Sequence, residues 1–113
     1  MSGRYDFTIN QGSTFGMAVK WKTKTGDVDL AGYRGRMQIR YNNANGEIAC
    51  DLNTENDGIQ INMFTGEIMI YISSEKTSKI RALPCVYDLE MVKGDYVERI
   101  LEGKIRISPE VTR

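Results

Sequence analysis

The sequence contains no histidine. This absence excludes every site that depends on an imidazole, whether a His-based acid–base pair, a catalytic triad or an imidazole-ligated metal. It also removes the usual base from cysteine catalysis. The glycine-flanked stretch Gly12-Ser-Thr-Phe-Gly16 lacks the Gly-Lys-Ser/Thr of a phosphate-binding loop and precedes a predicted strand. We therefore expect no enzymatic activity, no catalytic residue, no cofactor and no small-molecule substrate.

Cysteine is nearly as scarce, with only Cys50 and Cys85. Two thiols without a histidine do not make a zinc site. Each lies in an apolar run typical of a strand, and a disulfide would need both Cβ atoms to meet across strands in an oxidising compartment. We interpret both as buried, reduced thiols of a protein that folds in a cytoplasm.

The chain has no excess of either charge and no long apolar run. Fifteen basic and fifteen acidic residues give no formal net charge, which removes the electrostatic signature of a nucleic-acid-binding protein. No apolar run approaches the ~20 residues that span a bilayer. Residues 1–6 contain no apolar segment of a secretory signal. We expect neither nucleic acid nor a membrane as a partner.

Acidic and amide side chains crowd one predicted turn, where Asp51 is followed by Glu55, Asn56 and Asp57. Calcium binding is one interpretation of this cluster, but the twelve-residue ligand pattern of a calcium loop does not follow. Asn-Asp-Gly is typical of a plain turn. We therefore predict no metal site.

Alternation of apolar and polar residues dominates the rest of the sequence and predicts short strands. Residues 42–46 end in Asn-Gly, which is typical of a tight hairpin. Ile100 falls out of phase with Leu101, Ile105 and Ile107, which predicts a bulge within residues 98–100. The predicted strands are residues 5–9, 15–22, 34–41, 47–52, 59–63, 68–72, 85–92 and 97–108, with further turns at 24–27, 53–58, 64–66 and 93–95.

One segment departs from this alternation. Residues 74–83 predict the only helix, of one to two turns, with Ser73 or Ser74 as its N-cap and Glu75 in its first turn. Pro84 ends it.

Eight short strands with turns at regular spacing predict an all-β sandwich or barrel. The strand after the helix carries Tyr87-Asp-Leu89, and a tyrosine two residues before a core position is typical of the E–F corner of an immunoglobulin-like sandwich. Trp21 would supply the large apolar body of the core. We predict one domain, residues 1–113, folded as an immunoglobulin-like antiparallel β-sandwich of seven to eight strands with one short helix at 74–83. A barrel is the alternative.

This topology predicts a charged outer face. The third and seventh predicted strands lie side by side in such a sandwich. Arg36 and Arg40 then share an outer face with Asp88 and Glu90, and cross-strand ion pairs are the simplest interpretation.

Some apolar side chains also point outward by parity, namely Met69, Tyr71, Val86 and Val92. Scattered exposed apolar residues need no explanation, but a docking partner would also account for them. The candidate interface comprises Arg36, Arg40, Met69, Tyr71, Val86, Asp88 and Glu90.

Several stretches together carry a resemblance to a known family. They are Gln11-Gly-Ser-Thr-Phe15, Trp21, Asp29-Leu-Ala-Gly-Tyr33, Arg36-Met-Gln-Ile-Arg40, Thr65-Gly-Glu-Ile68, Ile72-Ser-Ser-Glu-Lys-Thr77, Val86-Tyr-Asp-Leu-Glu90, Arg99-Ile-Leu-Glu-Gly103 and Ile107-Ser-Pro-Glu-Val-Thr-Arg113. The chain resembles a family of small structural proteins encoded by tailed bacteriophages, over nearly its full length. It is similar also to the N-terminal sandwich domain of phage baseplate upper proteins, which attaches receptor-binding parts to the tail.

The resemblance implies a non-enzymatic structural component of a tailed-phage virion, in the tail, baseplate or head–tail region, acting through protein–protein contacts. Its partners would be other virion proteins, with copies of itself as one alternative. It would be found in the virion, and in the host cytoplasm during assembly. A small phage-encoded inhibitor or host-factor-binding protein is one alternative, and a capsid decoration protein is another. Residues 5–21 would form paired first strands, with residues 10–13 letting the chain turn or switch sheets.

Overall fold

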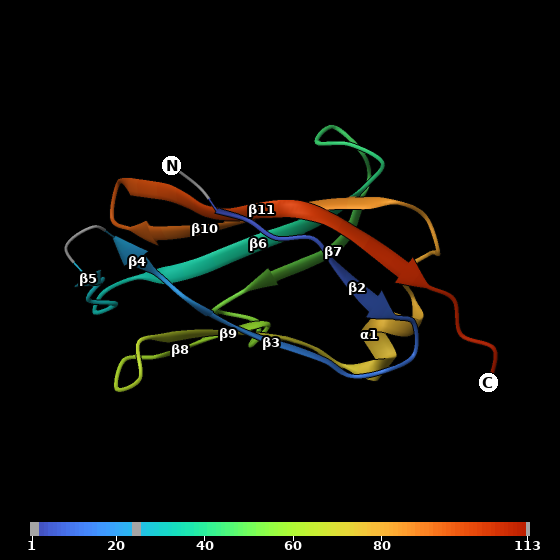
Figure 1. Cartoon of the computed structure of the whole chain (residues 1–113), viewed down its shortest axis with the longest axis horizontal. Coiled ribbons are helices and arrows are strands. Elements are labelled where there is room, and N and C mark those ends of the chain that lie inside the picture. The colour runs from blue at the N-terminus through green and yellow to red at the C-terminus, as the bar shows by residue number, and fades with distance from the viewer. Residues whose placement is uncertain (1–2, 24–25, 113) are drawn as a thin grey trace.

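Alternating apolar and polar residues organise the chain into two facing β-sheets, as the computed structural model shows (Figure 1). The structure describes residues 3–23 and 26–112. The turn predicted at 24–27 lies partly outside the described residues. The elements are β1 (Gly3–Arg4), β2 (Phe7–Asn10), β3 (Phe15–Lys20), β4 (Lys22–Thr23), β5 (Gly26–Asp27), β6 (Arg34–Tyr41), β7 (Ile48–Asn53), β8 (Ile59–Asn62), β9 (Glu67–Ile72), α1 (Ser74–Ser78), β10 (Cys85–Lys93) and β11 (Tyr96–Ser108).

The strand order is that of an immunoglobulin-like sandwich. The larger sheet runs β2–β11–β10–β6–β7, with β1 also beside β11, and the smaller of the two facing sheets runs β3–β9–β8. β4 and β5 pair with each other in a separate two-stranded sheet. β1 and β2 pair with β11 in parallel, whereas the other neighbours are antiparallel. The sheets remain separate layers, so the all-β sandwich is confirmed and the barrel alternative is wrong. Among the described residues, eight longer strands match the prediction, and the two-residue strands β1, β4 and β5 are additional.

The first two strands do not pair with each other, which corrects the prediction for residues 5–21. β2 lies beside β11, with Ile9 opposite Ile107, whereas β3 lies beside β9 in the other sheet. The link between them therefore switches sheets. Gly12 turns this link with a φ of 85°, a conformation that favours glycine, and its N–H donates to Thr77 Oγ1 of α1 (3.0 Å). Alternation identifies a strand without identifying its neighbour.

The helix is shorter than the predicted 74–83, because α1 ends at Ser78. Ser73 caps it as predicted, and its Oγ accepts a hydrogen bond from the third backbone N–H that follows (3.3 Å). Beyond the helix, the Arg81 N–H donates to the hydroxyl of Tyr41 (2.8 Å). This N–H therefore bonds to a side chain and not to a backbone carbonyl of a continuing helix. Ile80, 1% exposed, inserts into the core at the same point.

The core lies between the two sheets and has the predicted register. Met37 and Ile39 of β6 lie opposite Leu89 and Tyr87 of β10, and all four are buried together with the three isoleucines of β9. Burying one such side chain contributes roughly 1.5–3 kcal/mol. The core therefore stabilises the sandwich and also determines which residues remain outside.

Trp21 belongs to this core, as predicted, and closes one end of it. Its side chain is 9% exposed. The indole ring meets Tyr33 edge to face, with ring centroids 5.1 Å apart, which is a favourable aromatic geometry.

The hydroxyl of Tyr87 does not tie the E–F corner to nearby backbone, which corrects the expected tyrosine corner. It donates instead to the carbonyl oxygen of Tyr5 (2.6 Å). Burial, together with the nearby Asp6 carboxylate, raises the pKa of Tyr87 well above its ordinary value. The bond anchors the N-terminal segment to the centre of the larger sheet.

The bulge predicted within 98–100 is confirmed in β11. Leu89 lies opposite Leu101, but the next residue, Glu90, lies opposite Arg99, so Ile100 is the extra residue. A bulge adds one residue to one strand and shifts the side-chain phase. This accounts for the slip in the apolar pattern of the last strand.

A second bulge, in β7, was not apparent from the sequence. Ala49 has no partner on β6, and Ile48 then lies opposite Arg40. Ile48 is 42% exposed, although alternation predicts that it shares a face with Cys50 and Leu52. The flanking residues remain apolar on both sides of the bulge, so the pattern does not reveal it.

Both cysteine thiols are free, as predicted. Cys85 is buried and Cys50 half-buried. They lie on β10 and β7, which β6 separates. Cys50 is in line with Tyr87 rather than with Cys85, so the two cysteines lie farther apart than two strand spacings of about 9–10 Å, beyond the Cα separation that a disulfide spans. Burial raises the pKa of both thiols.

We predict that Ile70→Ala lowers the free energy of unfolding by about 2–5 kcal/mol, because Ile70 is 1% exposed and the truncation leaves a cavity. The matched control is Met69→Ala at the neighbouring position of β9, where the side chain points outward and is 38% exposed. We expect that control to change stability by less than about 1 kcal/mol. Urea unfolding followed by Trp21 fluorescence measures both. Equal losses for the two variants would contradict the assigned faces.

Candidate interaction surfaces

The outer face of the larger sheet carries paired charges. Arg36 Nε donates to Glu90 Oε1 across β6 and β10 at 2.7 Å, which confirms a predicted cross-strand pair. Asp88 lies 3.3 Å from Arg99 of β11. Exposed pairs of this kind contribute only about 0–1 kcal/mol each. They nevertheless give these four side chains their counter-charges within the protein itself.

Arg40 shares this outer face but does not pair with a carboxylate there, which corrects the second expected ion pair. In the register of β6 and β10 it lies opposite Val86. Its guanidinium donates to the side-chain oxygen of Gln38 (2.9 Å) and to the carbonyl of Gly46 (2.8 Å). Arg40 therefore fastens the turn between β6 and β7.

On this face, the surroundings of Asp88 raise the pKa of its carboxyl group. Partial burial is the main cause that raises its pKa, and Glu90 adds to it. Arg99 acts in the opposite direction without cancelling the rise. The folded protein therefore binds a proton at Asp88 at a higher pH than the unfolded chain does. The resulting stabilisation is complete below the unfolded pKa and is lost as the pH rises through the folded pKa.

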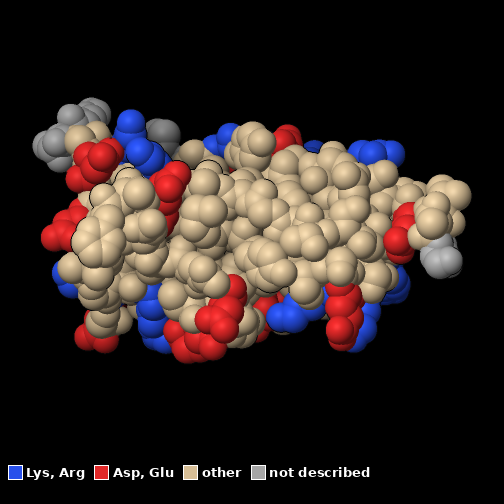
Figure 2. Space-filling view, turned by 90° about the horizontal axis from the view of Figure 1, so that it is seen from below, with Lys and Arg blue, Asp and Glu red and all other residues tan. Residues whose placement is uncertain are grey.

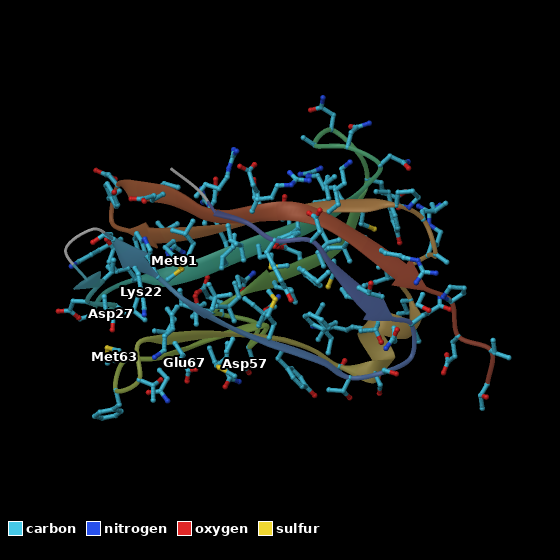
Figure 3. All side chains as sticks on the ribbon, in the orientation of Figure 1. Lys22, Asp27, Asp57, Met63, Glu67 and Met91 are labelled. Carbon is cyan, nitrogen blue, oxygen red and sulfur yellow. The ribbon has the colours of Figure 1, made fainter. Side chains whose placement is uncertain are left out.

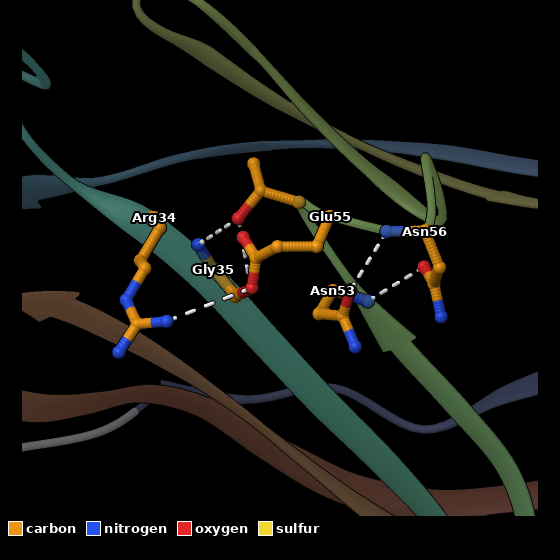
Figure 4. A network of polar contacts seen from close by, with 6 residues as sticks. Arg34, Gly35, Asn53, Glu55 and Asn56 are labelled. Atoms are coloured by element: carbon orange, nitrogen blue, oxygen red, sulfur yellow. Dashed lines mark hydrogen bonds and ion pairs between the residues drawn. The ribbon is translucent and has the colours of Figure 1, made fainter.

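The acidic turn after β7 is held by its amide side chains (Figure 4). The Asn56 N–H donates to Asn53 Oδ1 (2.8 Å), and the Asn53 N–H donates to Asn56 Oδ1 (3.0 Å). Glu55 reaches Arg34 of β6 at 3.6 Å. The amide oxygens of Asn53 and Asn56 and one carboxylate oxygen of Glu55 thus have partners within the protein. In residues 3–23 and 26–112, no three His, Cys, Asp or Glu side chains gather to hold a metal ion.

The outer face of the smaller sheet is nearly free of charge. Figure 2 shows a broad area without Lys, Arg, Asp or Glu across the middle of the side where β3, β8 and β9 lie. Met69 and Tyr71 project from β9 and are 38% and 48% exposed. Their partners on β3 are the small residues Ala18 and Gly16. We call these four residues the uncharged face.

The β8–β9 hairpin carries the most exposed aromatic side chain of the described chain at its tip. Phe64 is 99% exposed and Met63 is 63% exposed. Asn62 Oδ1 accepts hydrogen bonds from the N–H groups of Phe64 (3.0 Å) and Thr65 (3.3 Å), which gives the tip a defined shape. The sequence predicts this turn at 64–66 but assigns no role to Phe64, because parity has no meaning in a turn.

The predicted candidate residues lie on the outer faces of two different sheets and so do not form one continuous surface. Met69 and Tyr71 belong to the smaller sheet. Val92, expected outside, is only 3% exposed. The candidates on the larger sheet are Arg36, Arg40, Val86, Asp88 and Glu90.

No family model matches the chain, and no curated protein matches its sequence. Within the part of the chain that the structure describes, no helix has the length and apolar character to cross a membrane.

We expect Asp88→Asn to raise the free energy of unfolding at about pH 7, because asparagine keeps the side-chain shape without the charge that burial and Glu90 disfavour. The gain should shrink as the pH falls below neutral, because the wild-type carboxylate, with its raised pKa, then also takes up a proton. Thermal unfolding across this range measures the difference. A variant less stable than wild type at neutral pH would show instead that the contact with Arg99 outweighs the cost of burial.

Proposed function

We propose that this protein is a non-enzymatic structural component of a tailed-phage virion, in the tail, baseplate or head–tail region, and that it acts through protein–protein contacts. The sequence resembles small structural proteins of tailed phages over nearly its full length. The fold is a β-sandwich, as that resemblance implies. Its partners are other virion proteins, and it joins the particle from the host cytoplasm.

The observation that carries the proposal is the uncharged face together with the hairpin tip beside it. Met69 and Tyr71 are exposed on the face, and Met63 and Phe64 are exposed on the tip. A continuous exposed apolar surface bordered by charged residues is typical of a surface that another protein covers. The opposite face differs, because Arg36 and Glu90, and Asp88 and Arg99, provide each other's counter-charges within the chain.

Strand edges support the same proposal. β3 and β8 form the two edges of the smaller sheet, and β7 forms one edge of the larger sheet. An edge strand presents backbone N–H and C=O groups to which a strand of a neighbouring protein can add. Edge pairing and an adjoining apolar face together suit a component held between other structural proteins.

Mass spectrometry of purified virions of the phage that encodes the chain tests the proposal. We expect the chain in a reproducible ratio to the major structural proteins. Its absence from purified particles would overturn the proposal. Recovery of the chain bound to a bacterial protein in infected cytoplasm would support the inhibitor or host-factor alternative. A cryo-electron map of the particle distinguishes a tail position from capsid decoration.

We predict that Tyr71→Lys reduces incorporation into virions at least about tenfold, because contact would bury an unpaired charge. Tyr71 is 48% exposed, so the melting temperature of the isolated protein should change little. The matched control is Arg36→Gln on the opposite face, which we expect to be incorporated normally. Quantitative mass spectrometry of particles from a complemented deletion phage measures both. Normal incorporation of Tyr71→Lys would show that the uncharged face is not the contact surface.

A further inference from the structure

Two apolar features lie at opposite ends of the molecule, which is 45 Å long. One is the tip of the β8–β9 hairpin, marked by Met63 in Figure 3. The other is a groove beside the start of β10 and the end of β11, at the end where α1 and the last strand lie (Figure 1). Because they lie at opposite ends, the tip of one molecule cannot fill its own groove.

The groove arises from the unequal lengths of two paired strands. β10 begins at Cys85, which lies opposite Ile105, whereas β11 continues beside β2 to Ser108. The end of β11 therefore has no β10 residue beside it, and residues 82–84, which precede β10, border the space that is left. The resulting groove is about 600 Å³ in volume, a size typical of pockets that hold a small organic group. Its apolar lining includes Ala82, Leu83, Pro84, Val86, Ile107 and Pro109.

The rim of the groove is basic and suits an aromatic ring. Lys104 and Arg106 line it and are exposed, and neither makes an ion pair with another described residue. A cation over the face of an aromatic ring is attracted to it. The tip matches this rim, because residues 59–66 contain no charged residue and Glu67 follows directly. The Phe64 ring could therefore approach the cations of Lys104 and Arg106 without placing another positive charge beside them.

We infer that the Phe64 tip of one copy seats in this groove of a second copy, so that the chain self-associates head to tail. The inference rests on the proposed function, since it names a further copy of the chain as one structural partner. The contact joins two different surfaces, so successive copies build a ring if the rotation closes and a filament if it does not. The contact is smaller than a standard interface, so it is weak for one pair and gains strength when many copies are held together.

Sedimentation velocity of the purified chain, from about 10 µM to about 1 mM, tests the inference over the range expected of a weak contact. We expect the wild type to associate increasingly with concentration. Phe64→Lys removes the ring and places a cation against Lys104 and Arg106, and Leu83→Lys places a cation in the groove. Each should weaken association at least about tenfold. The control Asn45→Lys adds the same charge at an exposed position of the β6–β7 turn that does not line the groove, and it should behave as wild type.

Mixing the two variants gives the decisive result. The Leu83→Lys chain keeps an intact tip and the Phe64→Lys chain keeps an intact groove, so the mixture should form a one-to-one dimer and nothing larger. A mixture that stays monomeric, or association that survives Phe64→Lys, would overturn the inference. So would a wild type that is monomeric at the highest concentration. If Leu83→Lys melts early, Ala82→Lys at another exposed groove position takes its place. These outcomes concern the purified chain and do not depend on whether it is found in virions.

Discussion

The pairing of β6 with β10 is the constraint on which the rest of the structure depends. It places Met37 opposite Leu89 toward the core and, one residue away, Arg36 opposite Glu90 toward solvent. A slip by one residue would bury the charges and expose the core side chains. The ion pair itself contributes little, so the apolar alternation sets the register and the charges follow it. Both the buried core and the Arg36–Glu90 pair of the outer face result from this one pairing.

Alternation predicts what is local and misses what depends on distant neighbours. It identifies the strands, the faces of β6 and, except at Val92, of β10, and the bulge at Ile100, because each is visible in the phase of nearby residues. It does not reveal that β2 leaves β3 for the last strand, since any strand edge would accept it. The backbone that follows α1 is likewise held by Tyr41, whose hydroxyl accepts a hydrogen bond from the Arg81 N–H, 40 residues away in sequence.

The same limit applies to the candidate surfaces. Met69 and Tyr71 could be predicted, because they alternate with buried isoleucines in a regular strand. Phe64 could not, because a turn residue has no assigned face and its exposure depends on where the hairpin points. The groove was also beyond prediction, since it exists only because β11 extends past the start of β10. A sequence pattern describes single strands, whereas a groove needs the register between two.

The two faces of the sandwich differ in what they require from a partner. The larger sheet pairs several of its charges internally, as in Arg36–Glu90 and Asp88–Arg99, so contact with another protein at these pairs would cost solvation and return little. The smaller sheet and its hairpin tip expose apolar side chains that have no counterpart within the chain. With no formal net charge, copies are neither steered together nor held apart over long distances. Association therefore depends on short-range apolar fit, which is weak for single contacts and effective where assembly holds many copies close together.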